Sequence, residues 1–267
     1  MSVQFLENID DLLTRLREVY RQLHQQPELS MQEHKTAERI EAELAHLGLE
    51  VQRIGGTGVV AILRNGTGPT VLARADTDAL PVEEQTGLDY ASQVDGAMHA
   101  CGHDMHVVTL LGALELLATN KDTWSGTYIG VFQPGEETAQ GAQALVDDGL
   151  VEKIPKPDVA LAQHVMPTEA GTIGTSAGPV LSAGDSLKIT VYGRGAHGSM
   201  PHNAIDPVVL ASSIVMRLQT IVSRETKPGE FAVVTVGAFQ AGQAGNVVAH
   251  TATLRLSIRT TTPEDRD

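Results

Sequence analysis

Three apolar runs of this sequence are each followed by side chains that can bind a metal ion or carry a proton. Each run has the length and composition of a strand, and the third is apolar enough to predict a buried one. Sites in open α/β sheets form outside the carboxyl ends of strands, so we expect these side chains to converge. The runs with the groups that follow them are residues 70–75 with Asp76 and Asp78, 127–132 with Glu136 and Glu137, and 158–163 with His164.

Segments with helical periodicity alternate with these runs, which favours an α/β fold. Aromatic residues make up only 3% of the chain, so the core is expected to consist of Ala, Val, Ile and Leu. Apolar residues predict a first helix over 5–25, and a second opens at Ser30 with Glu33 completing a capping box. A third is expected over 104–120 with Asp104 as N-cap. Further strands are predicted at 49–54 and 59–63, and a further helix at 139–148.

The composition changes near Ala183, after a segment rich in glycine, serine and alanine, and this predicts domains 1–183 and 184–267. The second has the order strand, helix, strand, strand, which is most of a ferredoxin-like split βαβ sandwich. A helix start at 262–265 immediately precedes the end of the chain, so we interpret both domains as incomplete at the C-terminus. The four predicted elements are 187–191, 206–221, 231–239 and 252–258.

Composition and charge exclude several classes of partner. The formal net charge is −14 at pH 7, and no basic stripe relieves it, so neither nucleic acid nor an anionic membrane is expected to bind. No apolar run reaches the roughly 20 residues of a membrane span, and the N-terminus lacks a signal-peptide pattern. The single cysteine cannot form an intramolecular disulfide, which favours a reducing compartment and a cytoplasmic protein.

The segment MHACGHDMH, residues 98–106, gathers three of the ten histidines and the only cysteine. Thiolate and imidazole are ligands that borderline-soft transition metals prefer, so Cys101 and His103 form a candidate pincer for one ion. Residues two apart do not face each other in a helix, and Gly102 permits the irregular backbone that the pincer needs. From this segment alone, a buried cysteine beside a helix N-terminus is an equally good interpretation.

The other candidates are ambiguous by themselves. Adjacent acids such as Glu136 and Glu137 are common on solvated loops, but after a strand and a Pro-Gly turn one can bind a metal while its neighbour transfers protons. A histidine at a strand end, such as His164, is more often a hydrogen-bonded core residue than a ligand. Beside Cys101 and His103 it becomes a candidate third ligand.

Seven segments, in this order, resemble a single enzyme family over nearly the whole chain. They are similar to the aminoacylase, hippurate hydrolase and auxin-conjugate hydrolase branch of the dinuclear metallopeptidase-like amidohydrolases. The resemblance implies a mixed-sheet, zinc-exopeptidase-like α/β catalytic domain with an inserted α+β lid that also forms the dimer contact. The segments are HQQPELSMQE, RADTDALP, MHACGHDMH, FQPGEE, QHVMP, GRGAHGSMPH and GNVVAHTATLRLSIRT.

Carried over by position, the resemblance makes Glu136 the general base, and His197 of a partner subunit the group that stabilises the developing oxyanion. Asn246 resembles a lid residue that binds substrate, and Asp76 and Asp78 resemble acids that orient the metal ligands. Without the family, His197 is interpreted as an exposed loop histidine. The implied cofactor is two divalent ions, Zn, Mn, Co or Ni, held by Cys101, His103, Glu137 and His164.

The implied activity is hydrolysis of N-acyl amino acids, such as N-acetyl or N-benzoyl conjugates, by a homodimer joined through the lid. This chain departs from the family twice: the fifth ligand, a C-terminal histidine, lies beyond its end, and Ala249-His250 stand where a proline is usual. A catalytically inactive fragment that only binds metal or small ligands is therefore an alternative hypothesis. A third, a thiol enzyme with Cys101 as nucleophile, predicts fast alkylation of that residue.

Overall fold

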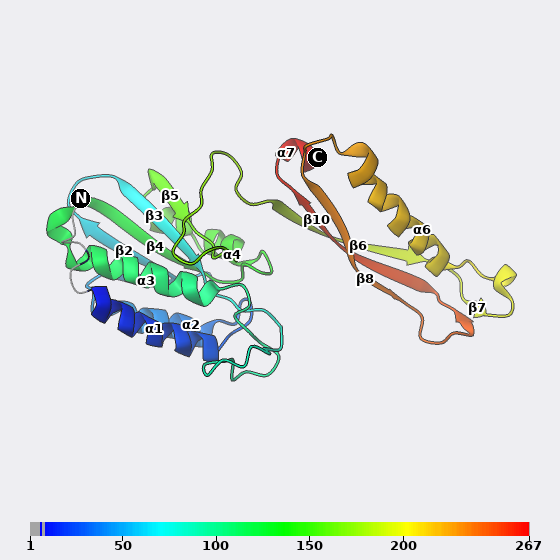
Figure 1. The fold of residues 1–267 in the computed structure, drawn as a ribbon, viewed down its shortest axis with the longest axis horizontal. Helices are drawn as coiled ribbons and strands as arrows, with labels where there is room; N and C mark the ends of the chain where they lie inside the picture. The colour runs from blue at the N-terminus through cyan, green and yellow to red at the C-terminus, as the bar shows by residue number, and fades with distance from the viewer. Residues whose placement is uncertain (1–5, 7–8, 267) are drawn as a thin grey trace. The chain divides into compact units, whose positions relative to one another are not determined.

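The computed structural model describes residue 6 and residues 9–266, without the side chains of residues 263 and 265. Residues 5, 7 and 8 of the first predicted helix therefore lie outside the described part. The chain divides into two compact units, Met1–Thr168 and Glu169–Asp267, which Figure 1 draws as one ribbon. The first strand of the second unit's sheet begins at Ala183, and the boundary between residues 183 and 184 stays a prediction. None of the described helices is long and apolar enough to cross a membrane.

The first unit is built on a five-stranded mixed sheet with the order β1-β2-β4-β3-β5. The strands β1, β2 and β4 pair antiparallel, whereas β3 runs parallel to both β4 and β5. Six successive residues of β2, 58–63, are buried because both faces of the sheet are covered. The strands are β1 Glu50–Ile54, β2 Gly58–Asn65, β3 Thr70–Asp76, β4 Gly126–Gln133 and β5 Val159–Ala162.

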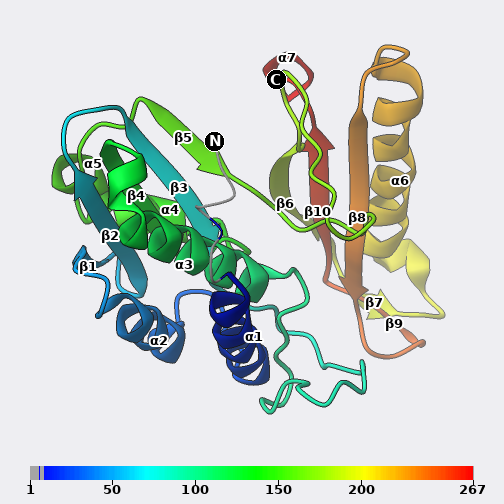
Figure 2. The same cartoon turned by 60° about the vertical axis from the view of Figure 1, so that its left-hand side comes forward.

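Helices cover the two faces of this sheet (Figure 2). Val59 and Ala61 of β2 pack in one core with α1, α2 and α3, whereas Val60 and Ile62 pack in a second core with Leu145 of α4. The alternation follows the two-residue period of a strand. The helical elements are α1 Ile9–Gln25, α2 His34–Leu44, α3 His103–Thr119, η2 Lys121–Thr123, α4 Gly141–Asp147 and α5 Leu150–Lys153.

The predicted capping box is wrong. The helix α2 begins at His34, and the Ser30 hydroxyl donates a hydrogen bond to Asp78 instead of capping the helix. The carboxylate of Glu28 accepts the free backbone N–H groups of Lys35 and Thr36, at 3.1 and 2.8 Å, and so caps the first turn. Glu33, the acid three residues after Ser30, therefore does not complete a capping box, and its carboxylate can form other contacts.

The predicted N-cap of the third helix is also wrong. The helix α3 begins at His103 after Gly102, whose φ of 79° lies in the left-handed region. Asp104 lies inside the first turn, where its carboxylate bonds to the ring of His24. The predicted strand at 158–163 forms as β5, but all four of its residues are exposed rather than buried, because β5 is an edge strand with a single neighbour among the described strands.

The second unit contains a three-stranded antiparallel sheet with the order β6-β10-β8, and α6 packs on it. β10 lies between β6 and β8 and runs opposite to both, which is the arrangement of a split βαβ unit. The helix α6 starts as predicted, since the Asp206 carboxylate accepts from the N–H groups of Val208 and Val209. The elements are β6 Ala183–Tyr192, β7 Ala196–His197, η3 Pro201–Asn203, α6 Pro207–Thr220, η4 Ile221–Glu225, β8 Ala232–Ala241, β9 Val247–Val248, β10 Thr251–Thr260 and α7 Pro263–Arg266.

Candidate metal centre

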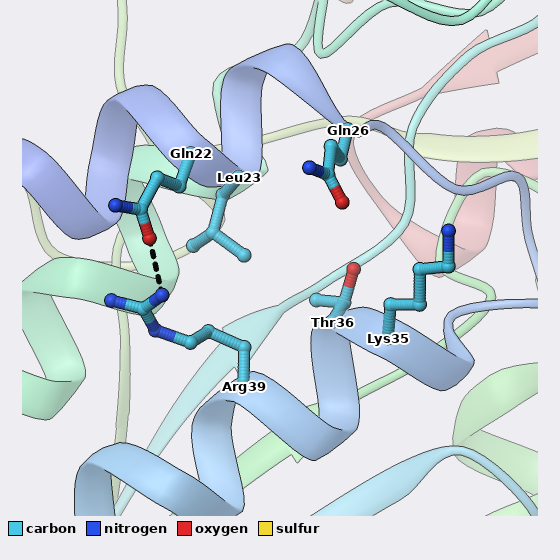
Figure 3. Close-up of a pocket in the computed structure, with 6 residues that line it drawn as sticks. All are labelled: Gln22, Leu23, Gln26, Lys35, Thr36 and Arg39. Atoms are coloured by element: carbon cyan, nitrogen blue, oxygen red, sulfur yellow. Dashed lines mark hydrogen bonds between the residues drawn. The ribbon is translucent and has the colours of Figure 1, made fainter.

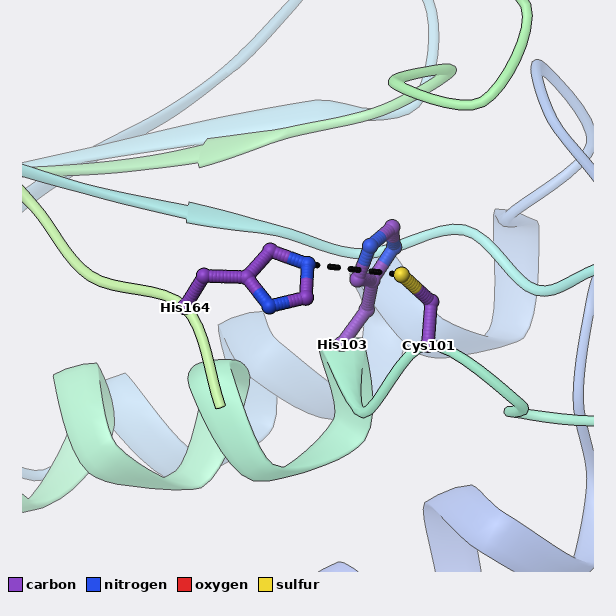
Figure 4. A group of neighbouring side chains, drawn as sticks. All are labelled: Cys101, His103 and His164. Carbon is purple, nitrogen blue, oxygen red and sulfur yellow. Dashed lines mark hydrogen bonds between the residues drawn. The ribbon is translucent and has the colours of Figure 1, made fainter. Parts of the chain in front are cut away.

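The carboxyl ends of β3, β4 and β5 lie at one edge of the first unit's sheet because these three strands are parallel. Asp76 closes β3, the loop after β4 carries Glu136 and Glu137, and His164 follows β5. His103, the first residue of α3, and Cys101, in the loop before that helix, lie at the same place (Figure 4). The structure therefore gathers side chains from four separate segments at one sheet edge.

Cys101, His103 and His164 form the first potential ligand group. One ligand atom of each lies within 4.8 Å of the others, and Cys101 Sγ is 3.3 Å from His164 Nε2. The left-handed Gly102 between the first two is required for space as well as for φ, since a Cβ there would lie 2.2 Å from Val165 Cγ2. The irregular backbone expected at this glycine is present.

Hydrogen bonds fix which nitrogen of each imidazole can bind an ion. His103 donates through Nδ1 to the backbone oxygen of Asp78 at 2.8 Å, and His164 donates through Nδ1 to the backbone oxygen of Val165 at 2.7 Å. In a neutral imidazole the other nitrogen then carries a lone pair. Both Nε2 atoms are therefore prepared as ligands, in the way that outer hydrogen bonds orient metal-binding histidines.

Two buried atoms of the site lack the partners that buried polar atoms normally have. Among the described residues, His103 Nε2 and Glu137 Oε1 are buried without a hydrogen bond, and they lie 3.8 Å apart. An unpaired buried polar atom costs free energy, so such a pair requires an explanation. One oxygen of Glu136 completes this second group, within 4.8 Å of ligand atoms of His103 and Glu137. A bound cation would satisfy both atoms.

The chemistry of the donor set fits divalent metal ions. Sulfur, imidazole nitrogen and carboxylate oxygen together suit Zn, Co, Ni and Mn. Without a cation, burial and the nearby negative charge of Glu137 raise the pKa of Cys101 to about 12. The thiol is then protonated at neutral pH, which argues against Cys101 as a catalytic nucleophile and for a thiolate that forms only with an ion bound.

Asp78 supports the ligands from inside. Its carboxylate accepts from the backbone N–H of Glu136 at 3.1 Å and of Glu137 at 3.0 Å, and its backbone oxygen accepts from His103. Burial alone would raise its pKa, but these hydrogen bonds and those from the His103 ring and Ser30 outweigh burial and lower it to about 2. The carboxyl group of Asp78 is therefore ionised at neutral pH, and Asp78 contacts residues of both candidate ligand groups.

Asp76 and His106 form a second support. His106 donates through Nδ1 to Asp76 at 2.5 Å and accepts through Nε2 from the N–H of Val165 at 2.9 Å. Since Val165 follows His164, these two hydrogen bonds connect the end of β3 to the candidate ligand after β5. Both nitrogens of His106 are occupied, so we assign His106 an orienting role with Asp76.

Two residues that support the site, His24 and Glu84, were missed by reasoning from the sequence. His24 is 5% exposed and donates through Nδ1 to Asp104 at 2.6 Å, while its Nε2 lies 3.4 Å from Glu84. Asp104 directly follows the candidate ligand His103, so α1 holds the start of α3 through this contact. The signal in the sequence was a histidine on the apolar face of the first predicted helix.

We expect His24→Ala to lower the free energy of unfolding by about 3–5 kcal/mol, since it leaves the buried carboxylate of Asp104 with the N–H of Met105 but without the imidazole that balances its charge. The hydrogen bond to Asp104 raises the pKa of His24 from 6.5 despite the opposing effect of burial. The ion pair therefore stabilises fully below pH 6.5, and this contribution is lost as the pH rises through the higher folded-state pKa. Urea denaturation should show a smaller loss in the variant at about pH 9 than at about pH 6; a loss that grows with pH would contradict the assignment.

The predicted lid residues lie together in the second unit. The strands β7 and β9 pair His197 with Val247, and the N–H of Gly198 donates to the backbone oxygen of Asn246 at 2.7 Å. His197 Nδ1 accepts from the N–H of Ser199 at 3.2 Å, so a neutral ring carries its proton on Nε2. His197 is exposed, so its Nε2–H group can donate a hydrogen bond to a bound molecule.

Two cavities of the first unit are lined by other residues than the candidate ligands. One is formed between α1 and α2, where Arg39 donates to Gln22 (Figure 3). A second is lined by residues of the segments 26–35 and 93–97. Neither cavity is lined by a predicted metal ligand. The candidate metal centre is therefore located by the positions of its potential ligand atoms and not by a cavity. The first cavity is lined by Gln22, Leu23, Gln26, Lys35, Thr36 and Arg39.

Known proteins of similar sequence are amidohydrolases. The chain is 41% identical over 263 residues to the N-acetyl-L-cysteine deacetylase of Bacillus subtilis, covering 97% of this chain and 62% of that protein. It is 40% identical over 267 residues to the hippurate hydrolase of Campylobacter jejuni, covering 99% and 69%. The chain thus spans about two thirds of the length of these curated relatives. The resemblance inferred from the seven segments is confirmed.

A solved structure and a family model agree. A dinuclear metal-binding peptidase of the M20 family from Bacillus subtilis superposes with a TM-score of 0.75 at 35% identity, covering 96% of this chain and 67% of that one. This likeness confirms the predicted fold class. The model of peptidase family M20/M25/M40 matches residues 72–258, which include every site residue that the sequence predicts. The chain belongs to peptidase family M20/M25/M40.

Proposed function

We propose that the whole protein hydrolyses the amide bond of N-acyl amino acids at a site for two divalent ions. The proposed ligands are Cys101, His103, Glu137 and His164. The observation that carries the proposal is the gathering of these four donors, in which two buried atoms, His103 Nε2 and Glu137 Oε1, have no hydrogen-bond partner among the residues that the structure describes. The names of the relatives, N-acetyl-L-cysteine deacetylase and hippurate hydrolase, supply the substrate class.

When bound, divalent ions in such a site would lower the pKa of a water molecule towards about 7 and would polarise the scissile carbonyl. In our proposal the Glu136 carboxylate accepts the proton of the attacking water and delivers it to the leaving amine nitrogen. The backbone N–H of Glu136 donates to the Asp78 carboxylate at 3.1 Å, and this hydrogen bond fixes the point of the backbone from which the Glu136 side chain extends. Glu137, one residue on, acts only as a ligand.

We assign His197 and Asn246 to substrate, with His197 of a partner subunit donating from Nε2 to the developing oxyanion. The exposed ring and its Nδ1 contact with Ser199 support this role. Asn246, held beside it by β7 and β9, would bind the amino-acid part. A homodimer joined through the second unit, and a cytoplasmic location suited to the single cysteine, belong to the same proposal.

The test is release of free amino acid from N-acetyl and N-benzoyl amino acids. We expect no release by protein stripped with chelator, and recovery on addition of Zn²⁺, Mn²⁺, Co²⁺ or Ni²⁺, because the site has no other source of an activated water. Tight binding of two ions without hydrolysis of any substrate would instead support the alternative of a binding fragment, and reject the proposed activity.

A further inference from the structure

The loop after β4 must hold two neighbouring acids in fixed places. Its three successive backbone N–H groups all donate to buried carboxylates: Gly135 to Glu33 at 2.8 Å, and Glu136 and Glu137 to Asp78 at 3.1 and 3.0 Å. Three consecutive donors fix the peptide planes of the loop, and with them the directions in which the acids leave the backbone. Asp78 fixes two of these planes, and Glu33 fixes the first.

Glu33 is the less expected of the two carboxylates. It is 0% exposed, yet its partners are neutral: Oε1 accepts from the N–H groups of Gly135 and Met31, both at 2.8 Å, and Oε2 accepts from the Thr57 hydroxyl at 2.5 Å. Burying a carboxylate among neutral donors costs free energy that an apolar side chain would avoid. A role in holding the loop explains why an acid stands there.

The segment 28–33 also fastens the end of β3. The Ser30 hydroxyl donates to Asp78 Oδ2 at 2.6 Å, and the N–H of Ala79 donates to the backbone oxygen of Glu28 at 2.8 Å. One short segment between α1 and α2 therefore contacts both the aspartate that supports His103 and the loop that carries the two glutamates.

This segment and the loop contact each other at two residues with unusual backbone conformations, Met31 and Gly135. Gly135 has a φ of 54°, and a Cβ on it would lie 2.5 Å from Met31 Sδ. Met31 itself has a φ of 64°, which is rare for a residue other than glycine. Because the N–H of Met31 and that of Gly135 meet on the same oxygen of Glu33, the carboxylate couples the two unusual conformations.

We propose that Glu33 is a positioning residue for Glu136 and Glu137, acting through the N–H of Gly135, and that Ser30 assists it through Asp78. The inference rests on the proposed function, since it requires Glu137 to be a metal ligand. It acts through hydrogen bonds rather than charge. A glutamine at position 33 can keep its oxygen on Met31 and Gly135 and donate its amide to Thr57.

The test measures Co²⁺ binding by calorimetry, with the thiolate-to-cobalt absorption band as a second signal. We expect Glu33→Ala to weaken binding by about 10–100-fold, the usual effect of losing an outer partner of a metal ligand, and to lower kcat with little change in KM. Glu33→Gln should bind close to wild type. Glu28→Ala is the matched control, because the Glu28 carboxylate also accepts three hydrogen bonds, from Lys35 and Thr36 in the first turn of α2, but none from the loop.

The outcomes separate the two claims. Wild-type affinity in a folded Glu33→Ala protein overturns the positioning role, and so does an equal loss in Glu28→Ala, which would indicate general destabilisation. If Glu33→Ala does not fold, Glu33→Asp decides, because it keeps the charge but is too short to reach both Thr57 and Gly135. Failure of the wild-type chain to bind Co²⁺ would overturn the metal site itself, and the inference with it.

Discussion

Glu136→Gln will lower kcat for N-acyl amino acids by about 10²–10⁴-fold while leaving metal affinity close to wild type. The amide has the shape of the carboxylate but does not accept a proton from water. The backbone N–H of residue 136 keeps its bond to Asp78, so the loop should not move. Steady-state kinetics on the metal-loaded protein, with calorimetry of ion binding, measure the two quantities.

The neighbouring acid provides the matched control. Glu137→Gln replaces a proposed ligand in the same loop, also held by Asp78, and should weaken ion binding before it affects the chemical step. Adding excess metal should therefore restore activity to Glu137→Gln but not to Glu136→Gln. The reverse pattern would mean that the roles of the two acids are exchanged, and full activity of Glu136→Gln would remove the general base from the proposal.

His103→Ala will abolish the stabilisation of the protein by divalent ions. His103 belongs to both candidate ligand groups, the one with Cys101 and His164 and the one with the two glutamates, and is fully buried, so its removal disrupts both. At an ion concentration 100 times the Kd, binding stabilises the wild type by about 2.7 kcal/mol, which corresponds to a rise in Tm of about 5–10 °C for a unit of this size. Thermal unfolding with chelator and with metal gives this difference directly.

The variant His46→Ala controls for the loss of a histidine, because His46 is exposed and follows α2, away from the strand ends. It should keep the wild-type rise in Tm with metal. If His103→Ala keeps that rise as well, the ions bind somewhere else in the protein. If both variants lose it, the effect is not specific to the proposed centre.

The strands and most helices followed from short-range patterns. The apolar runs at 59–63, 70–75 and 127–132 form β2, β3 and β4, because their length and composition are those of strands. The convergence of Glu137 and His164 on His103 also follows from a local rule, since each lies just after a strand and the strands are parallel. The assignment of individual roles came from the family resemblance, which the spacing of residues alone did not provide.

The errors arose where a side chain has a distant partner. A serine followed three residues later by an acid predicts a capping box, but Ser30 bonds to Asp78 and Glu33 bonds to Gly135, 102 residues away. Asp104 has the usual place and type of an N-cap, yet its carboxylate is taken by His24, 80 residues earlier. In each case a long-range contact competes with the local one, and sequence spacing carries no information on that competition.

The measurement that tests the metal centre most directly is anomalous diffraction from crystals of the protein loaded with Zn²⁺. We predict two anomalous peaks at the sheet edge, at bonding distances of about 2.0–2.3 Å from Cys101 Sγ, the Nε2 atoms of His103 and His164, and an oxygen of Glu137. Peaks bound only to other residues, or no peak in crystals soaked at concentrations that saturate the protein in solution, would contradict the account.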